Sequence, residues 1–225
     1  MTYLIIQWLL INMYFRYLAD MLHLASLLIL IMKIRQTRNC LGISCKTQEL
    51  YLIVFVSRYL DLFTTFISLY NTCMKISFIG LTAYLIFLMR FSRMHRQTYD
   101  KKSDSFPYWL YLLPPCFLLS LIFTYEYSIV EILWTFSIFL EAVSFVPQLD
   151  MLRKMKEVEN MTSHYVFTLG AYRAMYLVHW IMKIMAYEDI SWISLLAGIV
   201  QSALYADFFY YYIKAKLSMQ KSVPI

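Results

Sequence analysis

Charged residues are scarce in this chain of 225 residues. Asp, Glu, Lys and Arg make up 15% of it, against about 25% in a typical soluble domain. Glycine and proline are also few, with 4 and 5 residues, so the chain is not of low complexity. No basic face on a soluble fold is visible, and we therefore expect no nucleic-acid partner.

Cysteine lacks the spacing that binds zinc. The four cysteines form no Cys-x-x-Cys pair and have no histidine cluster beside them, so we expect unpaired thiols and no metal. Gly-rich phosphate loops, HExxH and GxSxG are absent as well, and nothing supports an intramembrane protease or acyltransferase. The sequence therefore predicts binding groups rather than an enzyme, and no cofactor.

Apolar residues are abundant, at 61% hydrophobic and 18% aromatic. A membrane-spanning helix needs about 20 of them, and backbone groups in lipid need partners within the helix. On that scale we predict an all-α, seven-helix membrane domain over residues 13–213, with a tail at 214–225. The seven predicted spans are Tyr17–Ile34, Tyr51–Ser68, Met74–Phe91, Tyr108–Tyr125, Ile129–Leu149, Tyr165–Tyr187 and Ile190–Ile213.

Lysine and arginine predict the orientation of these spans. Fifteen of the 20 basic residues lie at the ends of the first and third spans, in the loops after the first, third and fifth spans, or in the tail. Basic loops face the cytosol, so the N-terminus is expected on the lumenal or extracellular side. Residues 1–12 are apolar without a basic start, which disfavours a cleaved signal peptide. A longer first helix and a true start at Met13 both stay open.

A second set of charges lies inside the predicted spans. An ionisable group in hydrocarbon is costly and by default indicates a functional site. The cations suggest a polar cavity that holds an anionic ligand. The cations are Arg16, Arg58, Arg173 and Lys183, and the acids are Asp20, Asp61, Glu131, Glu141 and Asp207.

Helical spacing places several of these groups on common faces. Arg16, Asp20 and His23 share one face, although an interfacial Arg–Asp pair beside a packed histidine would give the same pattern. Arg58 and Asp61 are three residues apart and can pair within a helix.

Two later spans carry further polar faces. Glu131, Trp134 and Glu141 lie within about 80° of one another, which favours a cation-accepting pocket of ring and carboxylates. The sixth span carries another face, with Arg173 and Trp180 beside it, and Asp207 is the predicted counter-ion of Arg173. That face consists of Tyr172, Tyr176, His179 and Lys183.

Longer strings resemble the KDEL receptor family, the ER lumen protein-retaining receptors. The likeness covers about Met13 to the C-terminus. The strings are Gly42–Gln48, Arg58–Phe63, Ile67–Thr72, Glu131–Ile138 with Glu141, Pro147–Leu149, Thr162–Tyr165, Tyr172–Arg173 and Asp207–Tyr210.

The resemblance implies two three-helix repeats joined by a linker helix, as in SWEET and PQ-loop proteins. It also implies capture of C-terminal Lys-Asp-Glu-Leu tetrapeptides in the acidic Golgi, release in the near-neutral ER, and return in COPI-coated vesicles. The expected location is the membrane of the endoplasmic reticulum and cis-Golgi, with lipid as a further partner.

The same resemblance implies roles in ligand binding. Arg58, with Tyr59 nearby, would receive the terminal carboxylate of the signal. Arg16 and Lys183 would meet its two acidic side chains. The position of the first signal residue would be lined by Asp61, Glu131 and Trp134.

It further implies a switch and a sorting signal. Tyr172 and Glu141 resemble a hydrogen-bonded lock supported by Arg173, with His23 as the proton sensor. Lys214 and Lys216 resemble a coat-binding signal in the tail.

Two residues depart from the family pattern. Lys183 stands where arginine is usual and lacks its bidentate fork, and His179 stands where asparagine is usual and adds a titratable group. These departures leave the preferred tetrapeptide open. A weakly binding, divergent paralogue therefore remains an alternative, and so does a SWEET-like transporter of small solutes, which would share the implied architecture.

Overall fold

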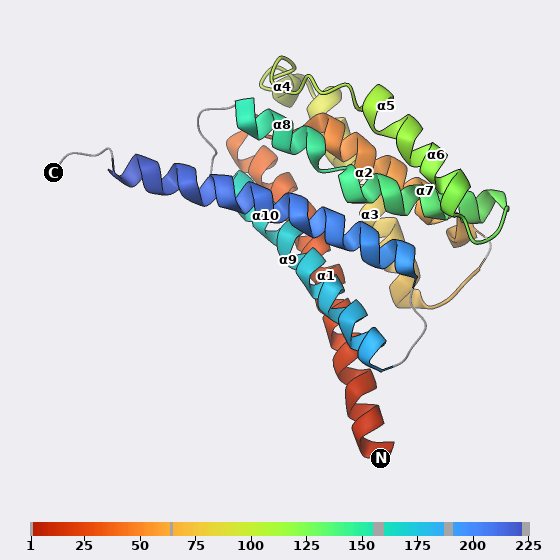
Figure 1. Cartoon of the computed structure of the whole chain (residues 1–225). Coiled ribbons are helices and arrows are strands. Elements are labelled where there is room, and N and C mark those ends of the chain that lie inside the picture. Colours follow the sequence, from red (N-terminus) through yellow and green to blue (C-terminus); the bar gives the residue numbers. More distant parts are fainter. Residues whose placement is uncertain (1, 64, 155–159, 187–190, 222–225) are drawn as a thin grey trace.

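The computed structural model describes the backbone of residues 2–63, 65–154, 160–186 and 191–221, and the side chains of 13–62, 65–154, 164–186 and 191–210. Every regular element in these ranges is a helix (Figure 1), which confirms an all-α protein. The elements are α1 (Thr2–Thr37), α2 (Cys45–Arg58), the 3-10 helix η1 (Leu60–Phe63), α3 (Leu69–Arg90), α4 (Arg93–Arg96), α5 (Tyr108–Tyr111), α6 (Leu113–Phe123), α7 (Ile129–Val143), α8 (Val146–Lys154), α9 (Asn160–Met185) and α10 (Trp192–Lys221).

Within the residues that the structure describes, four stretches are long and apolar enough to cross a membrane, and they overlap the first, third, fifth and seventh predicted spans. The apolar segment Tyr108–Phe123, at the fourth predicted span, is shorter. The fold is thus that of a helical membrane protein, while the count of seven spans stays a prediction. The four stretches are Met13–Thr37, Leu69–Arg90, Ile129–Lys154 and Trp192–Tyr210.

The second predicted span is wrong at both ends. Its helix begins earlier, at Cys45, because the Ser44 hydroxyl caps it by accepting a hydrogen bond from the Thr47 backbone N–H at 3.1 Å. It ends at Arg58, and the chain then tightens into η1. Asp61 therefore lies outside α2, and Arg58 occupies its last turn.

The fifth predicted span is one apolar stretch but two helices. α7 ends at Val143 and α8 begins at Val146. Pro147 explains the break, because proline has no backbone N–H and its ring clashes with the preceding helical turn. The break lies just after Glu141.

The helices pack so that charged side chains meet inside the bundle. α1 lies along α9, α2 packs against α7 and α3, and α10 covers α7 and α9 (Figure 1). Around this core, His23, Glu141 and Arg173 are only 6%, 4% and 7% exposed. Buried charges require partners, and those partners define the site described below.

A pair of turns fixes the start of α2 against the start of α8. The Ser44 backbone N–H donates to Gln148 Oε1 at 2.9 Å, and Gln148 Nε2 donates to the Gly42 carbonyl at 2.8 Å. Gly42 has a φ of 78°, a backbone conformation that glycine adopts without steric cost. The predicted repeat of three helices is not tested by this contact and stays a prediction.

Candidate functional site

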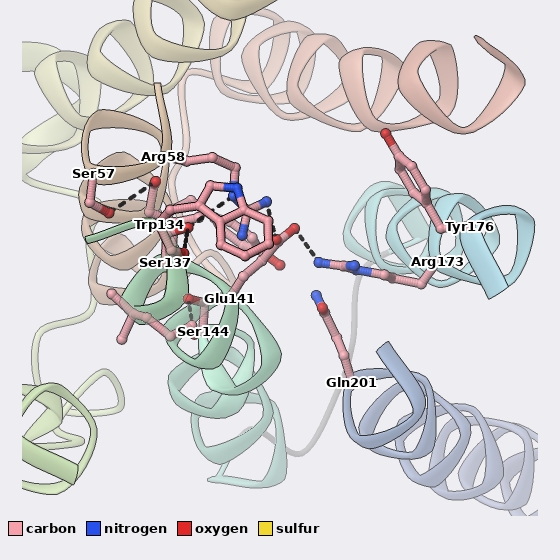
Figure 2. A network of polar contacts seen from close by, with 12 residues as sticks. Ser57, Arg58, Trp134, Ser137, Glu141, Ser144, Arg173, Tyr176 and Gln201 are labelled. Carbon is pink, nitrogen blue, oxygen red and sulfur yellow. Dashed lines mark hydrogen bonds and ion pairs between the residues drawn. The ribbon is translucent and has the colours of Figure 1, made fainter. Parts of the chain in front are cut away.

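Glu141 lies at the centre of a buried ion cluster. Arg58, from the end of α2, and Arg173, from α9, each form an ion pair with its carboxylate, one on each oxygen (Figure 2). A buried charge without its partner is strongly destabilising, so the three side chains hold one another in place. The cluster joins α2, α7 and α9.

Neutral groups complete the hydrogen bonding of this cluster. The Tyr172 hydroxyl donates to Glu141 Oε1 at 3.1 Å and accepts from Arg173 Nε at 3.0 Å and Gln201 Nε2 at 3.3 Å. Arg58 Nε donates to the Ser137 hydroxyl at 3.0 Å. Sequence reasoning missed Ser137 and Gln201. A lone glutamine in the apolar run of α10 was the available signal for the latter.

A cavity of about 350 Å³ opens beside the cluster. Two tryptophans and three guanidinium groups face it, with one carboxylate, and so its lining carries an excess of positive charge. Arg16 is exposed, and its side chain makes no hydrogen bond or ion pair with a described residue. This central cavity is lined by Arg16, Arg58, Trp134, Ile138, Glu141, Arg173, Tyr176, His179, Trp180, Ser194 and Ala197.

His23 connects α1 to the cluster through stacked rings. The centroid of its imidazole lies 4.2 Å from the centroid of the Tyr172 ring, at an interplanar angle of 4°. The imidazole also packs against the rings of Phe55 and Phe78. The Tyr172 hydroxyl in turn bonds Glu141. His23 is thus one aromatic ring away from the central carboxylate.

Asp20 binds tyrosines rather than the arginine one turn before it. It accepts hydrogen bonds from Tyr176 and, at 3.0 Å, from Tyr70. No ion pair joins it to Arg16 in the described part of the chain, and the alternative of an interfacial Arg–Asp pair therefore does not hold. Arg16 keeps its charge available to the central cavity.

The predicted ligand-binding residues divide into two groups. Arg16, Arg58, Trp134 and Trp180 line the central cavity. Four others lie outside its described lining. They are Tyr59, Asp61, Glu131 and Lys183.

Local structure explains most of these absences. Asp61 pairs with Lys75 at 2.6 Å rather than with Arg58, because η1 turns it away from α2. The same lysine lies over the Tyr59 ring. Glu131 occupies the first turn of α7, near the Ser128 cap, and only Trp134 and Glu141 of its predicted face reach the cavity.

The predicted lock residues are brought together with one exception. Glu141, Tyr172 and Arg173 are in contact, and His179 lines the same cavity. Asp207 is not the counter-ion of Arg173, and that prediction is wrong. It lies six residues after Gln201, about 9 Å further along α10 and about 120° around it, and pairs with exposed Arg153 at 2.5 Å.

Three further predictions concern the tail lysines, the start of the chain and metal binding. The side chains of Lys214 and Lys216 lie outside the described residues. α1 includes residues 2–12, while the possible start at Met13 stays open. Within the described ranges, no group of three or more His, Cys, Asp or Glu residues could hold a metal ion.

Comparison with known proteins agrees with the resemblance read from the sequence. The family model described as ER lumen protein retaining receptor matches residues 39–183. A relative of that name from Plasmodium falciparum is 50% identical over 212 residues, covering 93% of this chain and 96% of its own.

Relatives from distant organisms match equally broadly. One from Petunia hybrida is 47% identical, with 89% of this chain and 94% of its own covered. One from Drosophila melanogaster is 45% identical, with 92% and 96% covered. The chain therefore belongs to the ER lumen protein-retaining receptor family.

Proposed function

We propose that this protein is a retrieval receptor that binds the C-terminal Lys-Asp-Glu-Leu-like tetrapeptide of escaped ER-resident proteins. The observation that carries the proposal is the central cavity, where three guanidinium groups face one carboxylate. A free C-terminal carboxylate with two acidic side chains supplies the missing negative charge. Binding, rather than catalysis, is what such a set of groups provides.

Arg58 is the proposed anchor of the terminal carboxylate. Its Nη1 now pairs with Glu141 Oε2, and a ligand carboxylate can replace Glu141 at this guanidinium. Glu141 would not be left unpaired, because Arg173 and Tyr172 still bind it. Arg16, which has no partner to give up, would receive a second carboxylate of the signal.

Trp134 and Trp180 provide apolar walls that fit the aliphatic parts of a peptide. Lys183 is half-buried, one helical turn beyond His179. If it meets an acidic side chain of the signal, Lys183→Arg should bind equally well or better, and Lys183→Glu should not bind. Unchanged binding by the glutamate variant would exclude Lys183 from the site.

His23 is the proposed proton sensor. When a ligand carboxylate takes Arg58, Glu141 loses one of its cations, and a protonated imidazole near it becomes more favourable. Binding and protonation then promote each other by reciprocal linkage, and affinity weakens as pH rises. Such a receptor loads in an acidic compartment and unloads in a neutral one.

The proposed topology has seven spans, a lumenal N-terminus and a cytosolic tail, supported by the clustering of basic residues. Lys214 and Lys216 are proposed to bind the COPI coat. Changing both to serine should leave tetrapeptide binding intact and strand the protein in the Golgi. Normal return of that variant to the ER would refute the assignment.

The test of the function is binding of the tetrapeptide to the purified full chain in neutral detergent. We expect tighter binding at acidic than at neutral pH. Equal binding at both, or none, would contradict the proposal. Solute flux in liposomes would instead support a transporter, a reading that the cationic lining does not favour because neutral sugars need no such charge.

A further inference from the structure

A second, larger cavity lies near α4, apart from the central cavity. Its volume is about 520 Å³, and it shares no lining residue with the central cavity. It forms where the end of α3, the start of α2 and the segment after α4 meet, at the end of the bundle that carries α4 in Figure 1. This basic-end cavity is lined by Lys46, Arg90, Arg96 and Lys101, with Tyr99 and Asp104.

The one carboxylate in the lining of the basic-end cavity, that of Asp104, already accepts hydrogen bonds from the protein. Asp104 is 2% exposed and accepts hydrogen bonds from Ser44 Oγ at 2.8 Å, from the Lys46 backbone N–H at 3.3 Å and from the Tyr99 hydroxyl. These donors are all neutral. Asp104 therefore fixes the loops around the cavity and forms no ion pair with a lining cation.

The four lining cations differ in whether their side chains already bind another group of the protein. Arg90 pairs with Glu49. Lys46 Nζ donates to the Phe106 carbonyl at 3.0 Å, and because that acceptor is neutral, it does not balance the positive charge of Lys46. Arg96 and Lys101 are exposed, and their side chains make no hydrogen bond or ion pair within the described ranges. Two cations are thus ready to bind an anion.

One edge of the cavity carries an exposed apolar side chain. Phe91 lines it, is 68% exposed and stacks on Phe87 at 6.0 Å, and Met94 nearby is also exposed. α3, which ends at Arg90, is long and apolar enough to span a membrane. The mouth therefore lies where a span ends and lipid headgroups begin, with aromatic side chains placed to contact acyl chains.

We propose that the basic-end cavity binds a headgroup carrying two or more phosphates, presented by an anionic membrane lipid of the inositol-phosphate class. Clustered basic residues at the end of a span bind such headgroups through charge. Here the basic residues line a cavity, so they can surround a headgroup rather than only attract it to a surface. The chemistry is shared by the free inositol phosphate, which lacks the acyl chains that the aromatic edge would contact.

The sequence provides matched controls for this proposal. Arg93 and Lys102 are exposed cations of the same segment that do not line the cavity. A diffuse positive surface would use them as much as Arg96 and Lys101. The double variant Arg96→Ala/Lys101→Ala is therefore compared with Arg93→Ala/Lys102→Ala, which removes the same charge.

The experiment titrates the purified full chain, in neutral detergent, with a fluorescent short-chain phosphatidylinositol bisphosphate and reads anisotropy. Each cavity cation should contribute about five-fold, so the cavity double variant should bind about 25-fold more weakly and the control double variant less than two-fold. Tetrapeptide binding by both should match that of the unchanged protein.

Competitors identify the source of the anion. Displacement of the probe by unlabelled lipid but only weakly by soluble inositol trisphosphate assigns the site to the lipid, and equal displacement assigns it to the free anion. Equal losses in the two double variants would overturn the proposal, as would equal displacement by phosphatidylserine. Displacement by an acidic peptide but not by unlabelled lipid would also overturn it, in favour of a protein partner.

Discussion

The central cavity and the basic-end cavity each contain one buried carboxylate, and the two are held in different ways. Glu141 is bound by two guanidinium groups, those of Arg58 and Arg173. In the part of the chain that the structure describes, Asp104 is bound by neutral donors only. They are the Ser44 hydroxyl, the Lys46 backbone N–H and the Tyr99 hydroxyl.

This difference separates a carboxylate that can be exchanged from one that cannot. On the proposed function, a ligand anion takes a guanidinium from Glu141, because one carboxylate replaces another. An incoming anion takes no cation from Asp104, because the donors that bond it are neutral groups of the loops. Burial and the hydrogen bond to Asp104 also raise the pKa of Tyr99 well above its usual range, so that the phenol stays a neutral donor at physiological pH.

The largest expected effect is on the exchangeable carboxylate. Glu141→Gln keeps the side-chain size but leaves Arg58 and Arg173 without their counter-charge. Removing one partner of a buried pair costs about 3–5 kcal/mol, so the thermal midpoint in detergent should fall sharply. Glu141→Asp, which keeps the charge, should be less affected. A midpoint like that of the unchanged protein would show that the cluster does not stabilise the fold.

Asp104→Asn should have the next largest effect on stability. Its Nδ2 would replace either the oxygen that accepts from the Lys46 N–H and the Tyr99 hydroxyl or the oxygen that accepts from the Ser44 hydroxyl. Either way at least one hydrogen bond to a charged carboxylate is lost, and such a bond contributes about 1.5–3 kcal/mol. Tetrapeptide affinity should stay the same, because Asp104 lies outside the central cavity. If instead affinity fell with stability, the two cavities would not be independent.

Gly198 offers a test of the wall of the central cavity. A Cβ atom placed there would lie 2.3 Å from the Trp180 ring, so Gly198→Ala must displace this tryptophan. Overpacking of this kind costs about 1–3 kcal/mol, and we expect tetrapeptide affinity to fall about ten-fold. Gly80→Ala is the control, since nothing lies within 4 Å of its Cβ position. Equal affinities for the two variants would remove Trp180 from the binding site.

The smallest expected effect is on the pH dependence of tetrapeptide affinity. If binding takes up one proton at His23, affinity falls by at most about ten-fold per pH unit as the imidazolium loses its proton. The charged groups that act on His23 are Glu141, Arg173 and Arg58. His23→Phe keeps the ring stacked on Tyr172 and should flatten the profile.

The matched variant for this measurement is His179→Asn, because His179 lines the same cavity. It should keep the slope of affinity against pH. A retained slope in His23→Phe together with a lost slope in His179→Asn would move the sensor to α9.

Much of this arrangement could be predicted from the sequence, because a charge in an apolar run is rare and costly. Arg58, Glu141 and Arg173 were found in this way, and their resemblance to family strings gave them roles. Which acid pairs with which base was not predictable. The Asp207 prediction failed because pairing depends on how far along and around α10 a residue lies relative to Arg173.

Helix ends were less predictable than helix existence. Pro147 is a signal in the sequence for the break between α7 and α8. The end of α2 at Arg58 had no such signal, since the following residues are as apolar as a span. Because α2 ends at Arg58, Asp61 lies in η1 and pairs with Lys75, while Arg58 pairs with Glu141.

The central claim is that Arg58 exchanges Glu141 for the terminal carboxylate of the signal. Its most direct test is the affinity, at acidic pH, of a free-carboxylate tetrapeptide and of its C-terminal amide for the unchanged protein and for Arg58→Ala. We expect the amide to bind at least about 100-fold more weakly to the unchanged protein, and the two peptides to bind equally weakly to Arg58→Ala. A full preference for the carboxylate in Arg58→Ala would contradict the claim and place the anchor elsewhere.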